Sequence, residues 1–100
     1  MTENTQKSKE SSIFIGGKPF MNYVTGVILQ FGKGKKEITI KARGKFISKG
    51  VDVAEVARKK FLLEKKVVVK NVQIGSDEFE NKEGKLINVS TLEIVLRKGD

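Results

Sequence analysis

The middle of this sequence is a basic decapeptide, Lys41-Ala42-Arg43-Gly44-Lys45-Phe46-Ile47-Ser48-Lys49-Gly50. Before it, Glu37–Lys41 alternates polar and apolar residues and predicts a strand; from Ile47 to Leu63 the apolar spacing is that of an amphipathic helix. A strand-to-helix junction with cations, a flexible backbone and helix N-terminal N–H groups can hold phosphate. We therefore expect an anion-binding junction, the alternative being a solvated charged turn. The residues expected to bind are Lys41, Arg43, Gly44, Lys45 and Lys49.

The charge of the chain is concentrated around this junction. The formal net charge is +8, which favours an anionic partner. Gly16–Lys49 holds seven lysines and one arginine against one glutamate, a net charge of +7. A surface charged only for solubility would spread its cations more evenly, so the sequence predicts a localised basic face.

Several classes of function are excluded or disfavoured by composition. The chain has no cysteine and no histidine, which removes thiolate chemistry, disulfides, the usual general base and the usual zinc ligand. The acidic residues Asp77, Glu78, Glu80 and Glu83 could suggest a metal site, but their spacing does not match a calcium loop and a solvated arm is the simpler interpretation. We find no catalytic constellation and expect no enzyme activity and no cofactor.

No segment indicates a membrane or an export signal. No apolar run approaches the roughly 20 residues of a membrane span, and the first residues carry no apolar core of a signal peptide. We expect no membrane partner and a cytoplasmic location.

Upstream of the decapeptide, residues 1–12 are polar and predict a flexible tail, while residues 13–98 predict one domain. A short strand is expected over Ser12–Ile15. A helix is expected over Pro19–Phe31, with Pro19 at its first position and Gly32 ending it. Gly16-Gly17-Lys18 lacks the residues of a phosphate-binding P-loop, so this segment is either a phosphate-contacting turn or a plain strand–helix turn.

Downstream, valine-rich Lys66–Ile74 and alternating Val89–Arg97 predict two further strands. The polar segment Gly75–Asn88 between them predicts a hairpin that projects beyond the domain as an arm able to probe a nucleic-acid groove, with Lys82 and Lys85 as its expected nucleic-acid contacts. The order is β-α-β-α-β-β. Right-handed crossovers would place the first three strands in a small sheet with both helices on one face, and the terminal hairpin adds an antiparallel strand. The predicted fold class is therefore α/β, a two-layer sandwich with a four-stranded mixed sheet.

Three segments of the chain resemble the Alba family of archaeal chromatin proteins. They are Ile15-Gly16-Gly17-Lys18-Pro19-Phe20-Met21-Asn22-Tyr23-Val24, Ile40 to Asp52 including Ala42-Arg43-Gly44-Lys45, and Val89-Ser90-Thr91-Leu92-Glu93-Ile94. The resemblance runs in order from about Ile13 to Lys98. It implies a homodimer that binds double-stranded DNA without sequence preference, coats and compacts it in the nucleoid, and also binds RNA.

The resemblance also implies roles for individual residues. Lys18, Arg43 and Lys45 match positions that contact the nucleic-acid backbone, and Asn22 and Tyr23 lie in the matching helical turn. Phe61 matches an aromatic contact between dimers, although its pattern alone fits a core residue as well. Acetylation of a lysine before the proline is known in the family; here Gly17 replaces the first of two adjacent lysines, so the modification would fall on Lys18 or not occur.

A primarily RNA-binding role is the alternative function, for example in an RNA-processing particle or as a regulator of RNA structure. In that case Tyr23 and Phe20 could stack on bases if they were exposed.

Overall fold

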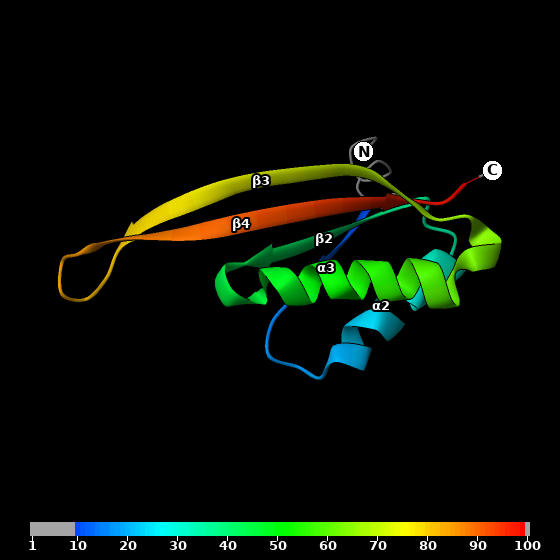
Figure 1. Ribbon diagram of the computed structural model, residues 1–100, viewed down its shortest axis with the longest axis horizontal. Coiled ribbons are helices and arrows are strands. Elements are labelled where there is room, and N and C mark those ends of the chain that lie inside the picture. Colours follow the sequence, from blue (N-terminus) through cyan, green and yellow to red (C-terminus); the bar gives the residue numbers. More distant parts are fainter. Residues whose placement is uncertain (1–9, 100) are drawn as a thin grey trace, which may run out of the picture.

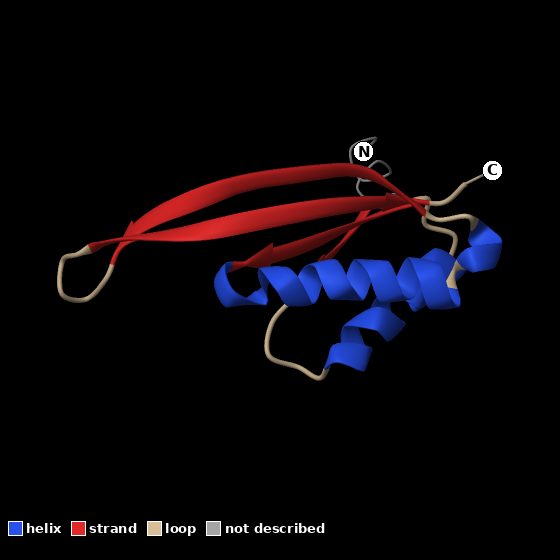
Figure 2. Cartoon of the chain, viewed as in Figure 1, coloured by secondary structure: helices blue, strands red, loops and turns tan. Residues whose placement is uncertain are grey.

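A four-stranded sheet with two helices on one of its faces makes up the computed structural model, which describes residues 10–99 (Figure 1). Figure 2 shows both helices on the same side of the strands, so the molecule has two layers. The predicted fold class is confirmed. The elements are β1 (Glu10–Phe14), α2 (Phe20–Gly32), β2 (Glu37–Arg43), α3 (Ile47–Val56), β3 (Val68–Glu80) and β4 (Leu86–Arg97).

The strand order is β1-β2-β4-β3, which places the last strand of the chain inside the sheet. β1 runs parallel to β2, whereas β4 is antiparallel to both β2 and β3. β2 and β3 are therefore parallel strands separated by β4. The terminal hairpin does not add its second strand at an edge; it inserts that strand between the two halves of the sheet.

The core lies between the helices and the inner face of the sheet. β2 alternates half-buried and buried residues, with Ile38, Ile40 and Ala42 turned toward the helices. Leu92, Ile94 and Leu96 of β4 continue this face. The helices contribute Tyr23, Val24, Val27, Phe31, Val53, Ala54 and Ala57. This is the period-two and helical spacing that the sequence predicts.

Both helices begin close to their expected positions. Pro19 is the N-cap of α2 and not its first helical residue, and the helix includes Gly32. α3 begins at Ile47 as expected, but a 3-10 turn over Gly44–Phe46 precedes it and a π-helical turn over Ala57–Phe61 follows it. Leu63 lies outside the helix, in a short 3-10 turn.

The strands are longer than the sequence pattern predicts. β1 begins at Glu10, within the predicted tail, whereas residues 1–9 of that tail lie outside the described residues. β3 continues to Glu80 and β4 begins at Leu86. Most of these extra residues are polar, apart from Phe79, Leu86 and Ile87, so no sustained apolar alternation indicates them; pairing between the two strands continues the β-structure through them.

The extension of this hairpin is a projecting arm. The last pair between β2 and β4 is Arg43 with Thr91, beyond which β3 and β4 pair only with each other. We call residues 76–90 the arm. Figure 1 shows it extending past the start of α3, as the length of the predicted hairpin suggested.

Candidate nucleic-acid interface

The β2–α3 junction forms a tight turn at the end of a buried strand. Gly44 has a φ of 57°, a left-handed conformation that favours glycine, and a side chain there would meet Val89 at 3.5 Å. The 3-10 turn that follows leads directly into α3 and leaves Lys45 exposed. The predicted strand-to-helix connection is therefore present.

The β1–α2 turn is held by one phenol group. The backbone N–H groups of Gly16 and Lys18 both donate hydrogen bonds to Tyr23 Oη, at 3.0 and 3.1 Å. Tyr23 lies in the first turn of α2, so the helix fixes the turn that precedes it. The turn is thereby ordered without a side-chain N-cap.

Lys49 joins the two junctions. Its Nζ donates to the carbonyl oxygens of Gly16 and Lys18, at 2.7 and 2.6 Å, although Lys49 itself belongs to α3. The same ammonium lies 5.0 Å from the centre of the Tyr23 ring, within cation–π range. We call the two hydrogen bonds accepted by Tyr23 Oη and the two donated by Lys49 Nζ the Tyr23–Lys49 anchor. It places the β1–α2 turn next to the start of α3.

This geometry bears on three residues considered for nucleic-acid contact, Tyr23, Phe20 and Lys49. Tyr23 is only 9% exposed and its hydroxyl is engaged, so it cannot stack on a base. Phe20 is half-buried against the core. The Lys49 ammonium donates hydrogen bonds to backbone carbonyls, so its first role is to order the β1–α2 turn and a contact with phosphate would come second.

The remaining predicted cations differ in how they are paired. Lys41 and Arg43 lie on the sheet face away from the helices, with Lys41 Nζ 3.9 Å from Glu93 and Arg43 Nη2 3.4 Å from Asp77. Exposed pairs of this kind contribute little to stability. Within residues 10–99, Lys18 and Lys45 have no carboxylate at ion-pair distance. They are exposed and available to an anion.

The start of α2 provides a second polar surface. Asn22 is exposed and, with Lys18, Tyr23 and Thr25, lines a shallow hollow beside the turn. Lys18 and Asn22, both expected at the interface, are therefore neighbours.

The arm keeps Lys82 and Lys85 away from the two junctions. Asn81 Oδ1 accepts hydrogen bonds from the backbone N–H groups of Glu83 and Lys85 and closes the turn at the tip. Both lysines are exposed there, among carboxylates of the same arm. Over the described residues, no three acidic, histidine or cysteine side chains are placed to hold a metal ion.

Phe61 is half exposed at the end of the π-helical turn, and its role as a contact between dimers stays a prediction. Earlier on the same helical segment, hydrogen bonds from Arg58, helped by the Lys59 ammonium, hold the pKa of the Glu55 carboxyl below its ordinary value.

In the part of the chain that the structure describes, no helix is long and apolar enough to span a membrane.

Two features were not predicted from the sequence. One is the Tyr23–Lys49 anchor, whose only signal is a lone tyrosine near a glycine-rich turn. The other is the apolar edge of the sheet: Val69, Val72 and Ile74 of β3 lie opposite the buried residues of β4 yet remain 37 to 79% exposed. A β-bulge between Val69 and Asn71 brings them onto one face, so simple alternation along the sequence could not place them together.

Comparisons with known proteins point to one family. The Alba family model matches residues 11–76. The DNA/RNA-binding protein Alba of Methanocella arvoryzae is 47% identical over 90 residues, covering 90% of this chain and 92% of its own. DNA/RNA-binding protein Alba 1 of Archaeoglobus fulgidus is 48% identical over 89 residues, covering 89% and 97%. The solved structure of Alba from Thermoplasma volcanium is similar with a TM-score of 0.79 and 42% identity, covering 87% of this chain and 99% of that one.

Proposed function

The chain belongs to the Alba family, and from that premise we propose that it is a non-enzymatic architectural protein of chromatin. It binds double-stranded DNA without sequence preference, coats and compacts it as a homodimer, and also binds RNA. The names of its relatives, which mention both DNA and RNA, support this assignment. Its place in the cell would be the nucleoid in the cytoplasm.

The observation that carries the proposal is the union of two basic junctions into one surface. Lys49 of α3 hydrogen-bonds the β1–α2 turn that carries Lys18, and α3 itself begins directly after the turn that carries Lys45. Lysine and arginine contacts to phosphate give affinity without sequence information. A surface of this kind fits the regular backbone of a duplex and does not select among bases.

The exposed edge of the sheet supports a homodimer. The side chains of Val69, Val72 and Ile74 extend the apolar inner face of the sheet beyond the helices. Contiguous exposed apolar surface of this kind marks protein interfaces. A second copy would cover it and would place two basic surfaces on one particle. Phe61, at the end of the helical segment, would then be free for contacts between dimers.

Salt dependence tests the electrostatic basis of binding. If each subunit neutralises about four phosphates, the logarithm of the association constant of a dimer falls with the logarithm of salt concentration with a slope of about −7. Arg43→Ala should weaken binding to unrelated duplexes by similar factors and make this slope shallower. Fluorescence anisotropy over a range of salt concentrations measures both. An affinity that does not respond to salt, or a loss restricted to one sequence, contradicts the proposal.

A primarily RNA-binding role is the second candidate, supported by the RNA in the names of the relatives. Competition between a duplex DNA and a structured RNA at one salt concentration separates the two. Preference for the duplex supports the chromatin role, and a large preference for RNA supports the alternative.

Modification of Lys18 would tune the interface. Its side chain is exposed, whereas its backbone is held by the Tyr23–Lys49 anchor. Acetylation would remove one cation from a well-ordered position, and Lys18→Gln is expected to imitate the resulting loss of affinity.

A further inference from the structure

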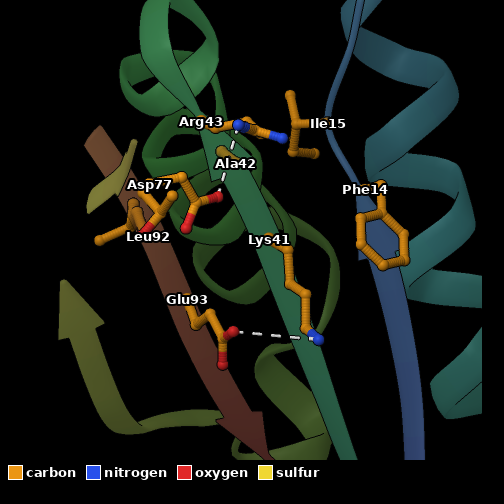
Figure 3. Close-up of a pocket in the computed structure, with 9 residues that line it drawn as sticks. Phe14, Ile15, Lys41, Ala42, Arg43, Asp77, Leu92 and Glu93 are labelled. Atoms are coloured by element: carbon orange, nitrogen blue, oxygen red, sulfur yellow. Dashed lines mark ion pairs between the residues drawn. The ribbon is translucent and has the colours of Figure 1, made fainter. Parts of the chain in front are cut away.

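The sheet face opposite the helices carries a shallow groove that contains Lys41 and Arg43, two of the cations expected to contact the duplex, together with residues to which the duplex gives no role. Figure 3 shows the Phe14 ring on one side of β2, the carboxylates of Asp77 and Glu93 on the other, and Lys41 and Arg43 between them. The groove has a volume of about 330 Å³, at the small end for a ligand site. It is therefore suited to one planar group and not to a folded partner.

Phe14 supplies a flat apolar surface at this groove. It is one of six phenylalanines in the chain, is the last residue of β1 and pairs in register with Lys41. Its side chain is 69% exposed. The Lys41 ammonium lies 5.5 Å from the centre of its ring. An exposed aromatic ring beside a cation is the arrangement on which unpaired bases stack.

The opposite wall offers acceptors next to donors. Lys41 and Glu93 are 3.9 Å apart, Arg43 and Asp77 are 3.4 Å apart, and both pairs are solvent-exposed. Thr91, which is paired with Arg43, also lines the groove. Loose exposed pairs can open and hydrogen-bond a ligand that has both donors and acceptors on one edge.

From this arrangement we propose that the groove binds one unpaired guanine of a single-stranded nucleic acid, such as an RNA loop. Phe14 stacks on the base, Asp77 or Glu93 accepts from its N1–H and N2 amine, and Arg43 or Lys41 donates to O6. Guanine is the one standard base with two adjacent donors beside an acceptor on its Watson–Crick edge, so a carboxylate beside a cation fits it best. The proposal rests on the proposed nucleic-acid binding and adds to it a base-reading site that shares Lys41 and Arg43 with the duplex contacts and is distinguished from them by Phe14, Asp77 and Glu93.

Three probes test the site in the full-length protein: an RNA hairpin with one guanine in its loop, the same hairpin with adenine there, and a blunt DNA duplex. We expect the native protein to prefer the guanine hairpin. Phe14→Leu keeps an apolar side chain but loses the flat ring, and should weaken guanine-hairpin binding about tenfold with duplex binding unchanged. Phe14→Tyr should retain the preference. Phe79→Leu, the same substitution on the arm, is the matched control and should also retain it.

The carboxylates require a separate variant. Asp77→Asn with Glu93→Gln removes two negative charges, so the affinity for both hairpins should rise or hold while the preference for guanine over adenine falls to about one. If the native protein binds the duplex but does not distinguish the hairpins, or if Phe14→Leu leaves the preference intact, the guanine site is refuted and the duplex-binding function is untouched. If the native protein binds neither duplex nor hairpin, the proposed function itself fails.

Discussion

Tyr23 is the only tyrosine of the chain, and its hydroxyl accepts two backbone hydrogen bonds in the β1–α2 turn. With Lys49 it fixes the turn that carries Lys18. Both residues were predicted to contact nucleic acid, and both act first on the protein itself. The sequence pattern singled out this turn, but it could not distinguish a side chain that contacts a ligand from one that orders the turn.

The Tyr23→Phe variant tests this role. The substitution leaves two N–H groups without their acceptor, so the free energy of unfolding should fall by about 1–2 kcal/mol and duplex affinity severalfold. Chemical denaturation and anisotropy measure the two effects. A variant with normal stability and weaker binding would instead mean that the hydroxyl contacts the ligand.

A pair of lysine substitutions separates position from charge. Lys49→Met and Lys60→Met each remove one cation from the same helical segment, but Lys60 is exposed near its far end. We expect Lys49→Met to weaken duplex binding more, because the carbonyls of Gly16 and Lys18 lose their donor. Equal losses of duplex affinity in the two variants would show that Lys49 contributes only its charge.

Glu55 makes stability depend on pH. Its pKa is lowered in the folded protein from an ordinary value of 4.5, so its contribution is present above that pH and disappears as pH falls through the lower, folded-state value. Because the ion pairs of Glu55 with Arg58 and Lys59 are only partly buried, Glu55→Gln should cost only about 0.5 kcal/mol at neutral pH. Thermal unfolding of both proteins from neutral to acidic pH should show the difference vanishing below 4.5.

At the scale of elements, α3 packs closely on β2 because of one glycine. A side chain at Gly50 would have its Cβ 3.0 Å from that of Ala42, which belongs to an inner strand and has little room to move. Gly26 of α2 differs, since a Cβ there would meet Ile13 at an ordinary 3.7 Å. The two helices therefore have different tolerance for the same change.

The two glycine-to-alanine variants provide the measurement. Gly26→Ala should stabilise the protein by up to about 1 kcal/mol through helix propensity. Gly50→Ala gains the same propensity but overpacks the interface, so we expect a net loss of about 1 kcal/mol. Urea unfolding decides the signs, and stabilisation by both substitutions would show that the packing of α3 is looser than described.

The elements could be predicted where burial leaves a period in the sequence. Val24, Val27 and Phe31 indicated α2, and Ile38 and Ile40 indicated β2. The arm has no buried face, so its strand residues look like a loop; backbone pairing with the opposite strand decides their conformation. The π-helical turn at Ala57–Phe61 likewise has no local sequence signal.

At the scale of the whole molecule, the exposed β3 face determines the proposed assembly. Ile74→Glu places a charge on a side chain that is 79% exposed in the single chain, so the subunit should fold normally while dimerisation is lost. Sedimentation velocity gives the mass in solution. Leu29→Glu, on exposed α2 surface, is the control and should leave the mass unchanged. A dimer that survives Ile74→Glu would place the contact on another face.

The strand order has a consequence for the making of the protein. β4 is synthesised after the other three strands, yet it lies between β2 and β3 and pairs with both. Until residues 86–97 have left the ribosome, β2 and β3 have unpaired edges, and such edges can pair with other chains. The four-stranded sheet therefore cannot form while only its first three strands have been translated. A chain interrupted before β4 would lack the strand that joins its two halves and would be a target for aggregation or degradation.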